Sequence, residues 1–219
     1  MMRTKIAGID YSLTSPAICV WKSSDDRLFD FDRCVVYYLE NKSRPTAHGI
    51  LNLHGDPYPE WKTEEERHDL ISNWALTCIQ GCEVFIEGYA FATSGTSHVR
   101  SIAENTGLLK HKLHKIKVPT KSVPPTVIKK YATGKGNANK ELMYEAFTAE
   151  LLTPSDLQTR LTPKSKKIKS PVSDIVDAYF IAKWGWEQFL CRLTRKANNK
   201  RGNGIIETEI RYWNNRRIV

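Results

Sequence analysis

The sequence predicts an α/β domain with a mixed sheet, and two observations support this fold class. Short apolar and β-branched runs gather in roughly the first 90 residues, whereas apolar positions at helical spacing alternate with single strands after them. The chain has 219 residues, of which 41% are hydrophobic and 10% aromatic, so it is able to bury one core.

Four strands and one helix are expected in the first part of the chain. The strands are predicted by apolar runs at residues 5–10, 16–21, 29–39 and 84–87. Residues 41–61 carry three prolines and two glycines without a clean periodicity, so we expect an exposed surface excursion there. Thr63 and Glu66 form a capping-box pattern, and it predicts the start of a helix with Ile71 and Trp74 on its apolar side.

Helices dominate the remaining chain. Helical patterns are found at residues 99–115, from Pro124 onward, at 140–152 and at 173–184, the last with Ser173 as its cap. A fifth strand is expected at residues 118–123, and a loop at residues 133–139, where two glycines and two asparagines lie.

We expect residues 1–184 to form the folded domain and residues 185–219 to form a basic C-terminal extension. The first residues lack the apolar segment of a signal peptide, and no apolar run approaches the roughly 18 residues of a membrane span. Five cysteines, an odd number scattered along the chain, do not predict a disulfide framework. These features predict a cytoplasmic protein without membrane association, or one in the host cell cytoplasm if the protein is viral.

Positive charge is concentrated in one stretch of the sequence. The chain carries 33 Lys and Arg against 24 Asp and Glu, a net charge of +9, which favours a polyanion such as nucleic acid as the partner. Between Lys110 and Lys140 there are nine lysines and no acidic residue. The candidate DNA contacts in this stretch are Lys110, Lys112, Lys115, Lys130 and Lys135. Two further basic clusters lie at residues 164–169 and from Gly185 onward.

Four acidic residues stand where strands end or a helix begins. Asp10 and Glu87 end two predicted strands, while Asp174 and Asp177 are three apart at the start of the last helix and so share one face. Such a cluster of carboxylate oxygens can hold two divalent cations about 4 Å apart, which supports phosphodiester hydrolysis. Each acid alone also has an ordinary explanation, because acids stabilise helix N-termini and mark where strands reach solvent.

Three segments in order resemble the RuvC-type Holliday-junction resolvases of the RNase H-like superfamily. They are Gly8-Ile-Asp10 with the ten residues after it, residues 84–91 and residues 173–177. Residues 127–140 add to the likeness, because a lysine, a Gly-containing turn and a second lysine precede the helix with the last acids. The resemblance spans roughly residues 4–184 and is strongest to the divergent branch found in bacteriophages. Bacterial members commonly have Pro-Gly after the first Asp, where this chain has Tyr11-Ser12.

The resemblance implies an RNase H-like mixed five-stranded sheet flanked by helices, and a homodimer that nicks the two strands of a four-way DNA junction symmetrically. It also implies two Mg²⁺ ions per active site, for which Mn²⁺ can substitute. The residues that match the family's metal-binding acids are Asp10, Glu87, Asp174 and Asp177. Lys129 and Lys140 match its two catalytic lysines, and Tyr89 or Phe91 corresponds to the aromatic that wedges between base pairs near the crossover.

Three other functions are compatible with parts of the sequence. An actin-like phosphotransferase shares the first strand, but it holds ATP phosphates with a glycine turn that Tyr11 and Ser12 do not provide. An RNase H-like nuclease acting on flaps, forks or RNA–DNA hybrids uses the same kind of acids. A basic protein that binds branched DNA without cutting it is expected to lack one of the four acids, and none is missing here.

Overall fold

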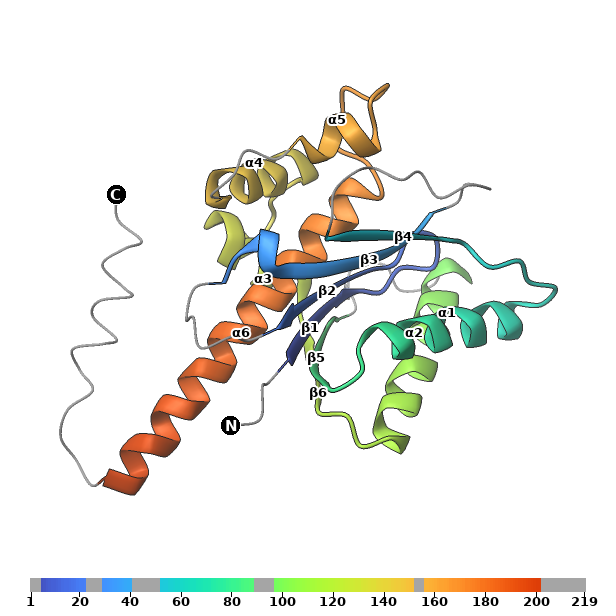
Figure 1. Cartoon of the computed structure of the whole chain (residues 1–219). Helices are drawn as coiled ribbons and strands as arrows, with labels where there is room; N and C mark the ends of the chain where they lie inside the picture. The colour runs from blue at the N-terminus through green and yellow to red at the C-terminus, as the bar shows by residue number, and fades with distance from the viewer. Residues whose placement is uncertain (1–4, 23–28, 41–51, 89–96, 152–155, 202–219) are drawn as a thin grey trace. The chain divides into compact units, whose positions relative to one another are not determined.

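The computed structural model describes residues 5–22, 29–40, 52–88, 97–151 and 156–201 (Figure 1). The chain divides into two compact units, Met1–Gly185 and Trp186–Val219. The first unit contains a six-stranded sheet with helices on both of its faces, which confirms the predicted α/β class with a mixed sheet.

The strands are β1 (Lys5–Asp10), β2 (Ala17–Lys22), β3 (Cys34–Glu40), β4 (Leu53–Pro57), β5 (Cys82–Glu87) and β6 (Thr120–Val123). Their order across the sheet is β4-β3-β2-β1-β5-β6. Strand β2 is antiparallel to its two neighbours, while the other neighbouring pairs are parallel. The carboxyl ends of β1, β3, β4, β5 and β6 therefore lie at the same edge of the sheet.

The prediction of five strands is wrong by one, because β4 lies within the segment that we expected to be an exposed excursion. Its sequence, Leu-His-Gly-Asp-Pro, has no β-branched residue, so its composition does not predict a strand. Backbone hydrogen bonds to β3 hold it, from Val36 N to Asn52 O at 2.8 Å and from Tyr58 N to Glu40 O at 2.8 Å. An edge strand also tolerates Pro57. Residues 41–51 of the predicted excursion lie outside the described residues.

The helices are α1 (Glu64–Cys78), α2 (Ser97–Lys115), α3 (Pro125–Thr133), α4 (Lys140–Glu150), α5 (Leu157–Leu161) and α6 (Val172–Arg201), with a short 3₁₀ helix at Phe31–Arg33. Thr63 caps α1 as predicted, since its Oγ1 accepts a hydrogen bond of 3.2 Å from Glu66 N. The strand predicted at residues 29–39 begins only at Cys34, after the 3₁₀ helix, and two α-helices differ from prediction. Helix α5 was not expected, and α6 extends past Trp184 because its later residues are good helix formers without proline.

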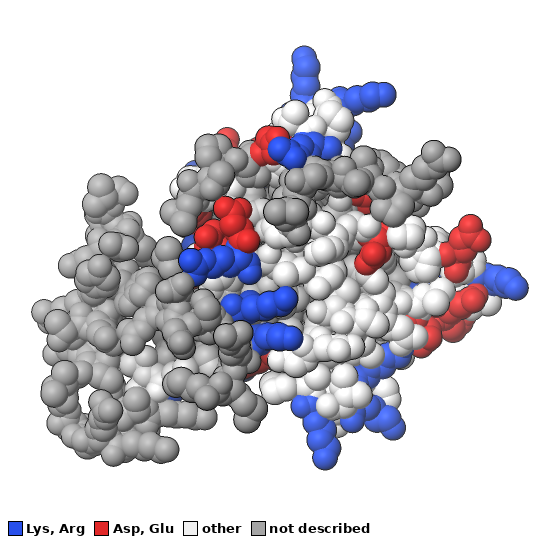
Figure 2. Space-filling view, in the orientation of Figure 1, with Lys and Arg blue, Asp and Glu red and all other residues white. Residues whose placement is uncertain are grey.

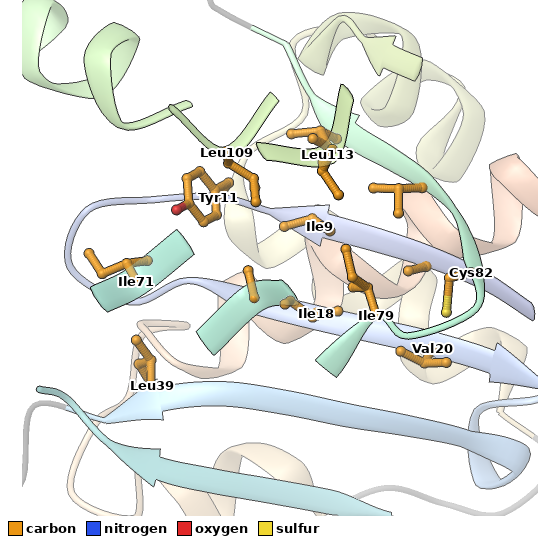
Figure 3. Close-up of a cluster of buried hydrophobic side chains, with 14 residues drawn as sticks. Ile9, Tyr11, Ile18, Val20, Leu39, Ile71, Ile79, Cys82, Leu109 and Leu113 are labelled. Atoms are coloured by element: carbon orange, nitrogen blue, oxygen red, sulfur yellow. The ribbon is translucent and has the colours of Figure 1, made fainter. Parts of the chain in front are cut away.

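One face of the sheet packs against α1 and α2 (Figure 3). Odd-numbered residues of β1, such as Ile9, lie here with Ile18 of β2 against Ile71 of α1 and Leu109 and Leu113 of α2. These side chains are fully buried. Their positions follow from the alternation of side chains between the two faces of a strand and from the three- and four-residue spacing of apolar side chains along a helix. This layer forms much of the hydrophobic core.

Helix α6 covers the other face of the sheet, and Gly8 of β1 allows it to come close. A Cβ at Gly8 would lie 2.5 Å from Ala178 O and closer still to Ala182 N, so only glycine fits between strand and helix. Tyr179 of α6 contacts Phe147 of α4, with ring centroids 5.1 Å apart, which ties these two helices together. None of the described helices is long and apolar enough to cross a membrane.

Candidate active site

Asp10 and Glu87 lie at the same end of adjacent parallel strands. Ile9 of β1 is paired with Ile86 of β5, and both belong to the core layer beneath α1 and α2. Since successive side chains of a strand alternate between faces, the next residue on each strand, Asp10 and Glu87, projects to the face that carries α6. Two carboxylates therefore meet at the carboxyl edge of the sheet.

Asp174 and Asp177 reach the same place from the start of α6. Ala178 and Ala182 lie against Gly8, and the charges of Asp174 and Asp177, in the turn of α6 before them, act on Asp10 at the carboxyl end of β1. Asp174 is 7% exposed and Asp10 9% exposed. The close approach at Gly8 is thus what brings the helix acids to the strand acids.

Electrostatics shows that the four acids form one cluster. Burial raises the pKa of Asp10 well above its usual value, and the negative charges of Glu87, Asp174 and Asp177 raise it further. Burial, then Glu87 and Asp174, raise the pKa of Asp177 to about 7. Burial also raises the pKa of Glu87, with a further contribution from Asp174. Acids that shift one another's pKa in this way are typical of functional sites.

Lys129 of α3 and Lys140 of α4 are the positive charges in this cluster. Lys129 lowers the pKa values of Glu87 and Asp177, and Lys140 lowers those of Asp10 and Asp177, each opposing the effect of burial. Helix α3 ends at Thr133, and Gly134 after it has a φ of 77°, which permits the left-handed turn that leads toward α4. The structure therefore brings together all six residues that the sequence singled out as acids and catalytic lysines.

Ser173 is a site residue that the sequence did not identify as one. It was expected to cap α6, but the helix begins at Val172, and Ser173 N already donates to Lys169 O at 3.1 Å. The Ser173 side chain is 3% exposed, and its Oγ donates to Asp174 Oδ1 at 3.0 Å. Lys140 Nζ in turn donates to Ser173 Oγ at 3.1 Å. Ser173 thus links a lysine of the cluster to one of its acids.

The cluster has the donors that a hard divalent cation requires. Asp174 Oδ2 is buried and has no hydrogen-bond partner among the described residues, although a buried carboxylate oxygen normally has one. As they stand, no three Asp, Glu, His or Cys side chains in the described part of the chain lie close enough together to hold a metal ion. The donor set fits Mg²⁺ or Mn²⁺, since both prefer carboxylate oxygens.

The predicted DNA contacts divide into three groups. Lys130 and Lys135 are at the end of α3 and just after it, at the same edge of the sheet as the acids. The remaining three lysines, Lys110, Lys112 and Lys115, lie on the last turns of α2, which runs back from β5 toward the start of β6. They are therefore at the opposite end of the sheet from Glu87. Tyr89 and Phe91 lie outside the described residues.

Lys112 has a structural role in addition to any contact with DNA. Its Nζ donates to Asp69 Oδ1 at 2.6 Å, to Ser72 Oγ at 2.7 Å and to Asn73 Oδ1 at 2.6 Å, all on α1. These bonds tie α2 to α1, and the aspartate offsets the lysine charge. Figure 2 likewise shows Lys and Arg in several separate groups on the face in view, and not in one continuous patch.

Solved structures with the same fold identify the fold of this chain. No protein-family model matches the sequence, and no curated protein matches it. Among solved structures, Thermus thermophilus RuvC in complex with Holliday junction substrate matches with a TM-score of 0.54 and 18% identity, over 87% of this chain and 96% of that one. A second structure of Thermus thermophilus RuvC matches with a TM-score of 0.50 and 18% identity, over 87% and 97% of the two chains.

The yeast mitochondrial Holliday junction resolvase is similar as well. It matches with a TM-score of 0.51 and 14% identity, over 90% of this chain and 82% of that one. The three matches span nearly the whole length of both partners, so the likeness concerns a complete domain and not a shared motif. The chain has the α/β RNase H-like fold of the RuvC-type resolvases, with a mixed sheet flanked by helices.

Proposed function

We propose that the protein is a divalent-metal-dependent endonuclease that resolves four-way DNA junctions. The observation that carries this proposal is the gathering of Asp10, Glu87, Asp174 and Asp177 into one partly buried cluster with Lys129 and Lys140 beside it. Support for the substrate comes from the structural neighbours, one of which was solved with Holliday junction substrate and another of which is a Holliday junction resolvase.

The four acids would hold Mg²⁺, or Mn²⁺ in its place, two ions to a site. Bound divalent cations would activate water and neutralise charge that develops on the phosphodiester in the transition state. The raised pKa values of Asp10 and Asp177 mean that cation binding must compete with protons, because a ligand carboxyl has to be deprotonated. Binding of the metal is therefore expected to release protons near neutral pH.

The other residues of the cluster position the phosphate and the ligands. The ammonium groups of Lys129 and Lys140 lie among the acids, so a scissile phosphate beside these acids would meet positive charge as negative charge develops on its oxygens. Ser173 fixes the rotamer of Asp174 through its hydrogen bond to Oδ1, which leaves Oδ2 free for a cation. An acid held in this way loses less entropy when it binds the ion.

Resolution of a junction requires two nicks, and one acidic cluster cuts one strand at a time. We therefore propose that two copies of the chain act together as a homodimer, each nicking one strand at symmetric positions. The assignment to the bacteriophage branch and a location in the cytoplasm belong to the same proposal. The bacteriophage assignment rests on the sequence resemblance. The cytoplasmic location rests on the five cysteines, which are all free, because a reducing compartment keeps thiols from forming disulfides.

A cleavage assay with end-labelled synthetic substrates tests the proposal. A four-way junction, a linear duplex of the same sequence and a flap are incubated with the protein in Mg²⁺, in Mn²⁺ and in EDTA. We expect paired symmetric nicks in the junction with either metal and none in EDTA. Preferred cutting of the flap would replace junction resolution by another nuclease activity. Binding of the junction without any metal-dependent cutting would favour a non-cleaving branched-DNA-binding protein.

A further inference from the structure

A groove beside the acidic cluster is lined by the segment that leads into α6. Its lining comes from the loop after β1, from the end of β3 and from residues 161–171. The polar residues of this lining that matter here are Thr14, Ser15, Glu40, Lys164, Lys169 and Ser170. We call this feature the linker groove. None of its residues belongs to the cluster of acids and lysines described above.

The lysines of the linker groove project from a fixed segment of chain. Leu161 and Ile168 of this segment are buried, and Ser173 N donates to Lys169 O at 3.1 Å. In the same segment, Ser165 N donates to Thr162 O at 2.9 Å, and Gln158 Nε2 donates to Ser165 O at 3.2 Å. Because the backbone is held in this way, a ligand bound by these lysines would not have to order a loop.

The charge of this segment is entirely positive. Residues 157–173 contain no acid, and Lys164, Lys166, Lys167 and Lys169 are exposed. None of the four forms an ion pair with another residue in the part of the chain that the structure describes, in contrast to Lys112. Glu40 is the acid in the lining, but it is only 5% exposed. An anion that enters the groove therefore meets the exposed ammonium groups of Lys164 and Lys169 and the hydroxyls of Thr14, Ser15 and Ser170, with one buried carboxylate in the lining.

The linker groove and the acidic cluster share two stretches of backbone. Thr14 and Ser15 follow Asp10 in the loop after β1, and Ser170 lies shortly before Asp174. These features follow one another along the edge of the sheet. The groove begins at β3, Asp10 lies on β1, and Glu87 lies on β5. Lys129 is close to Glu87. Three strand spacings of about 4.8 Å separate β3 from β5, so the path is about 14 Å long. A nucleic acid strand with a rise of about 3.4 Å covers that path with a few nucleotides.

We propose that the linker groove binds phosphates of the DNA strand that is cut, on the β3 side of the acids. The backbone of the strand then crosses the acidic cluster between two basic supports, Lys164 and Lys169 on one side and Lys129 on the other. This inference rests on the proposed function, because it assumes that the substrate of the acids is DNA. It assigns a role to a basic segment far in sequence from the lysines of residues 110–140.

The test uses the full chain with a fluorescent four-way junction in EDTA, so that binding is measured without cleavage. Binding is followed by anisotropy at salt concentrations between about 50 and 200 mM. The variant is Lys164→Gln with Lys169→Gln. The matched control, Lys22→Gln with Lys117→Gln, removes the same charge from exposed positions at the opposite end of the sheet. A third protein, Lys164→Arg with Lys169→Arg, keeps the charge.

Each lysine that binds a phosphate contributes about 0.9 to the slope of log affinity against log salt, so the glutamine variant should have a slope lower by about 1.8. The advantage of the wild type over the glutamine variant should then shrink by about tenfold between about 50 and 200 mM salt. The control and the arginine variant should keep the wild-type slope.

The outcomes separate the two proposals. A wild-type chain that binds and cuts the junction, together with a glutamine variant whose slope matches the control, would overturn the linker groove alone. A wild-type chain that neither binds nor cuts any branched DNA would overturn the proposed function, and the groove with it. Circular dichroism confirms that each variant is folded before the slopes are compared.

Discussion

Ser173 Oγ donates a hydrogen bond of 3.0 Å to Asp174 Oδ1, the carboxylate of the next residue. Both residues lie inside α6, which begins at Val172, so this bond is not a helix cap. The same hydroxyl accepts from Lys140 Nζ at 3.1 Å. Through this link, the position of α4 determines how one acid of the cluster is held. The second oxygen of Asp174 is buried and has no partner among the described residues, so the arrangement presents it to a cation.

Replacing Ser173 therefore tests whether this link supports metal binding. We expect Ser173→Ala to weaken Mn²⁺ binding by about 10- to 100-fold, the usual effect of removing a partner of a metal ligand. The loss should appear in calorimetric titration of the DNA-free protein as well as in the cleavage rate. Ser173→Thr keeps the hydroxyl and should restore most of the affinity. Equal Mn²⁺ binding by the alanine variant and the wild type would show that the bond is only structural.

The burial of carboxylates beside one another predicts a specific dependence of stability on pH. The pKa of Asp177 is about 7 in the folded chain, against an ordinary value of 3.8, so the folded state binds more protons than the unfolded state between these two pH values. In EDTA, the titration of Asp177 should then lower the free energy of unfolding as pH rises through this window, and this contribution should level off above about pH 7. The raised pKa of Asp10 acts in the same direction.

The variant Asp177→Asn separates this effect from other titrations. It removes one of the crowded negative charges, so we expect a higher Tm than that of the wild type at about pH 8 in EDTA. The difference should be at least roughly 2–4 °C, the shift that 1 kcal/mol gives in a chain of this size. Mg²⁺ should stabilise the wild type more than the variant. Thermal melts at about pH 5 and pH 8 measure both differences, and a wild type that is more stable at pH 8 than the variant in EDTA would contradict the prediction.

Gly8 sets the distance between β1 and α6, so its replacement should be severe. In Gly8→Ala the new methyl group would collide with the backbone at Ala178 and Ala182, and neither can move without shifting α6 away from the acids. We expect a loss of at least about 3 kcal/mol of stability, or no folded protein. Gly107→Ala is the matched control, because a Cβ there meets nothing within 4 Å. Gly107 lies within α2, where alanine favours the helix more than glycine does, so Gly107→Ala should raise the free energy of unfolding by about 0.5–1 kcal/mol. Chemical denaturation measures both variants.

Lys129 should act on cleavage more than on binding. It lies among the acids and lowers the pKa values of Glu87 and Asp177. Lys129→Ala removes one phosphate contact, so we expect a change in salt slope of about 0.9, together with a fall in cleavage rate of about 100-fold or more. Single-turnover cleavage at saturating protein measures the second quantity. A cleavage rate and a salt slope that both equal those of the wild type would show that Lys129 contacts neither the phosphate nor the reacting groups.

Much of the candidate site was predictable because it depends on local patterns. Asp10 and Glu87 end apolar runs, and a run that ends on a carboxylate indicates where a buried strand reaches the edge of its sheet. Asp174 and Asp177 have helical spacing. These patterns indicated where each acid stands on its element, and the resemblance to RuvC-type resolvases implied that the four acids share one site.

The features that the sequence did not reveal depend on tertiary packing. Strand β4 has no strand-like composition, and it exists because the backbone of β3 pairs with it. The hydrogen bond of Ser173 depends on where α4 lies. The lysines from Lys110 to Lys140 are continuous in sequence, yet α2 runs back along the sheet and leaves Lys110, Lys112 and Lys115 at the end opposite to the acids. Charge along a sequence therefore did not show its distribution in space.

The most direct test of whether the acidic cluster cuts DNA compares the wild type with Asp177→Asn on one labelled four-way junction in Mg²⁺. We predict paired nicks by the wild type, and binding without nicks by the variant, because one ligand charge is removed while the basic residues remain. Nicking by the variant at the wild-type rate would contradict the assignment of the four acids to the active site. Absence of nicking by the wild type would contradict the proposed nuclease activity itself.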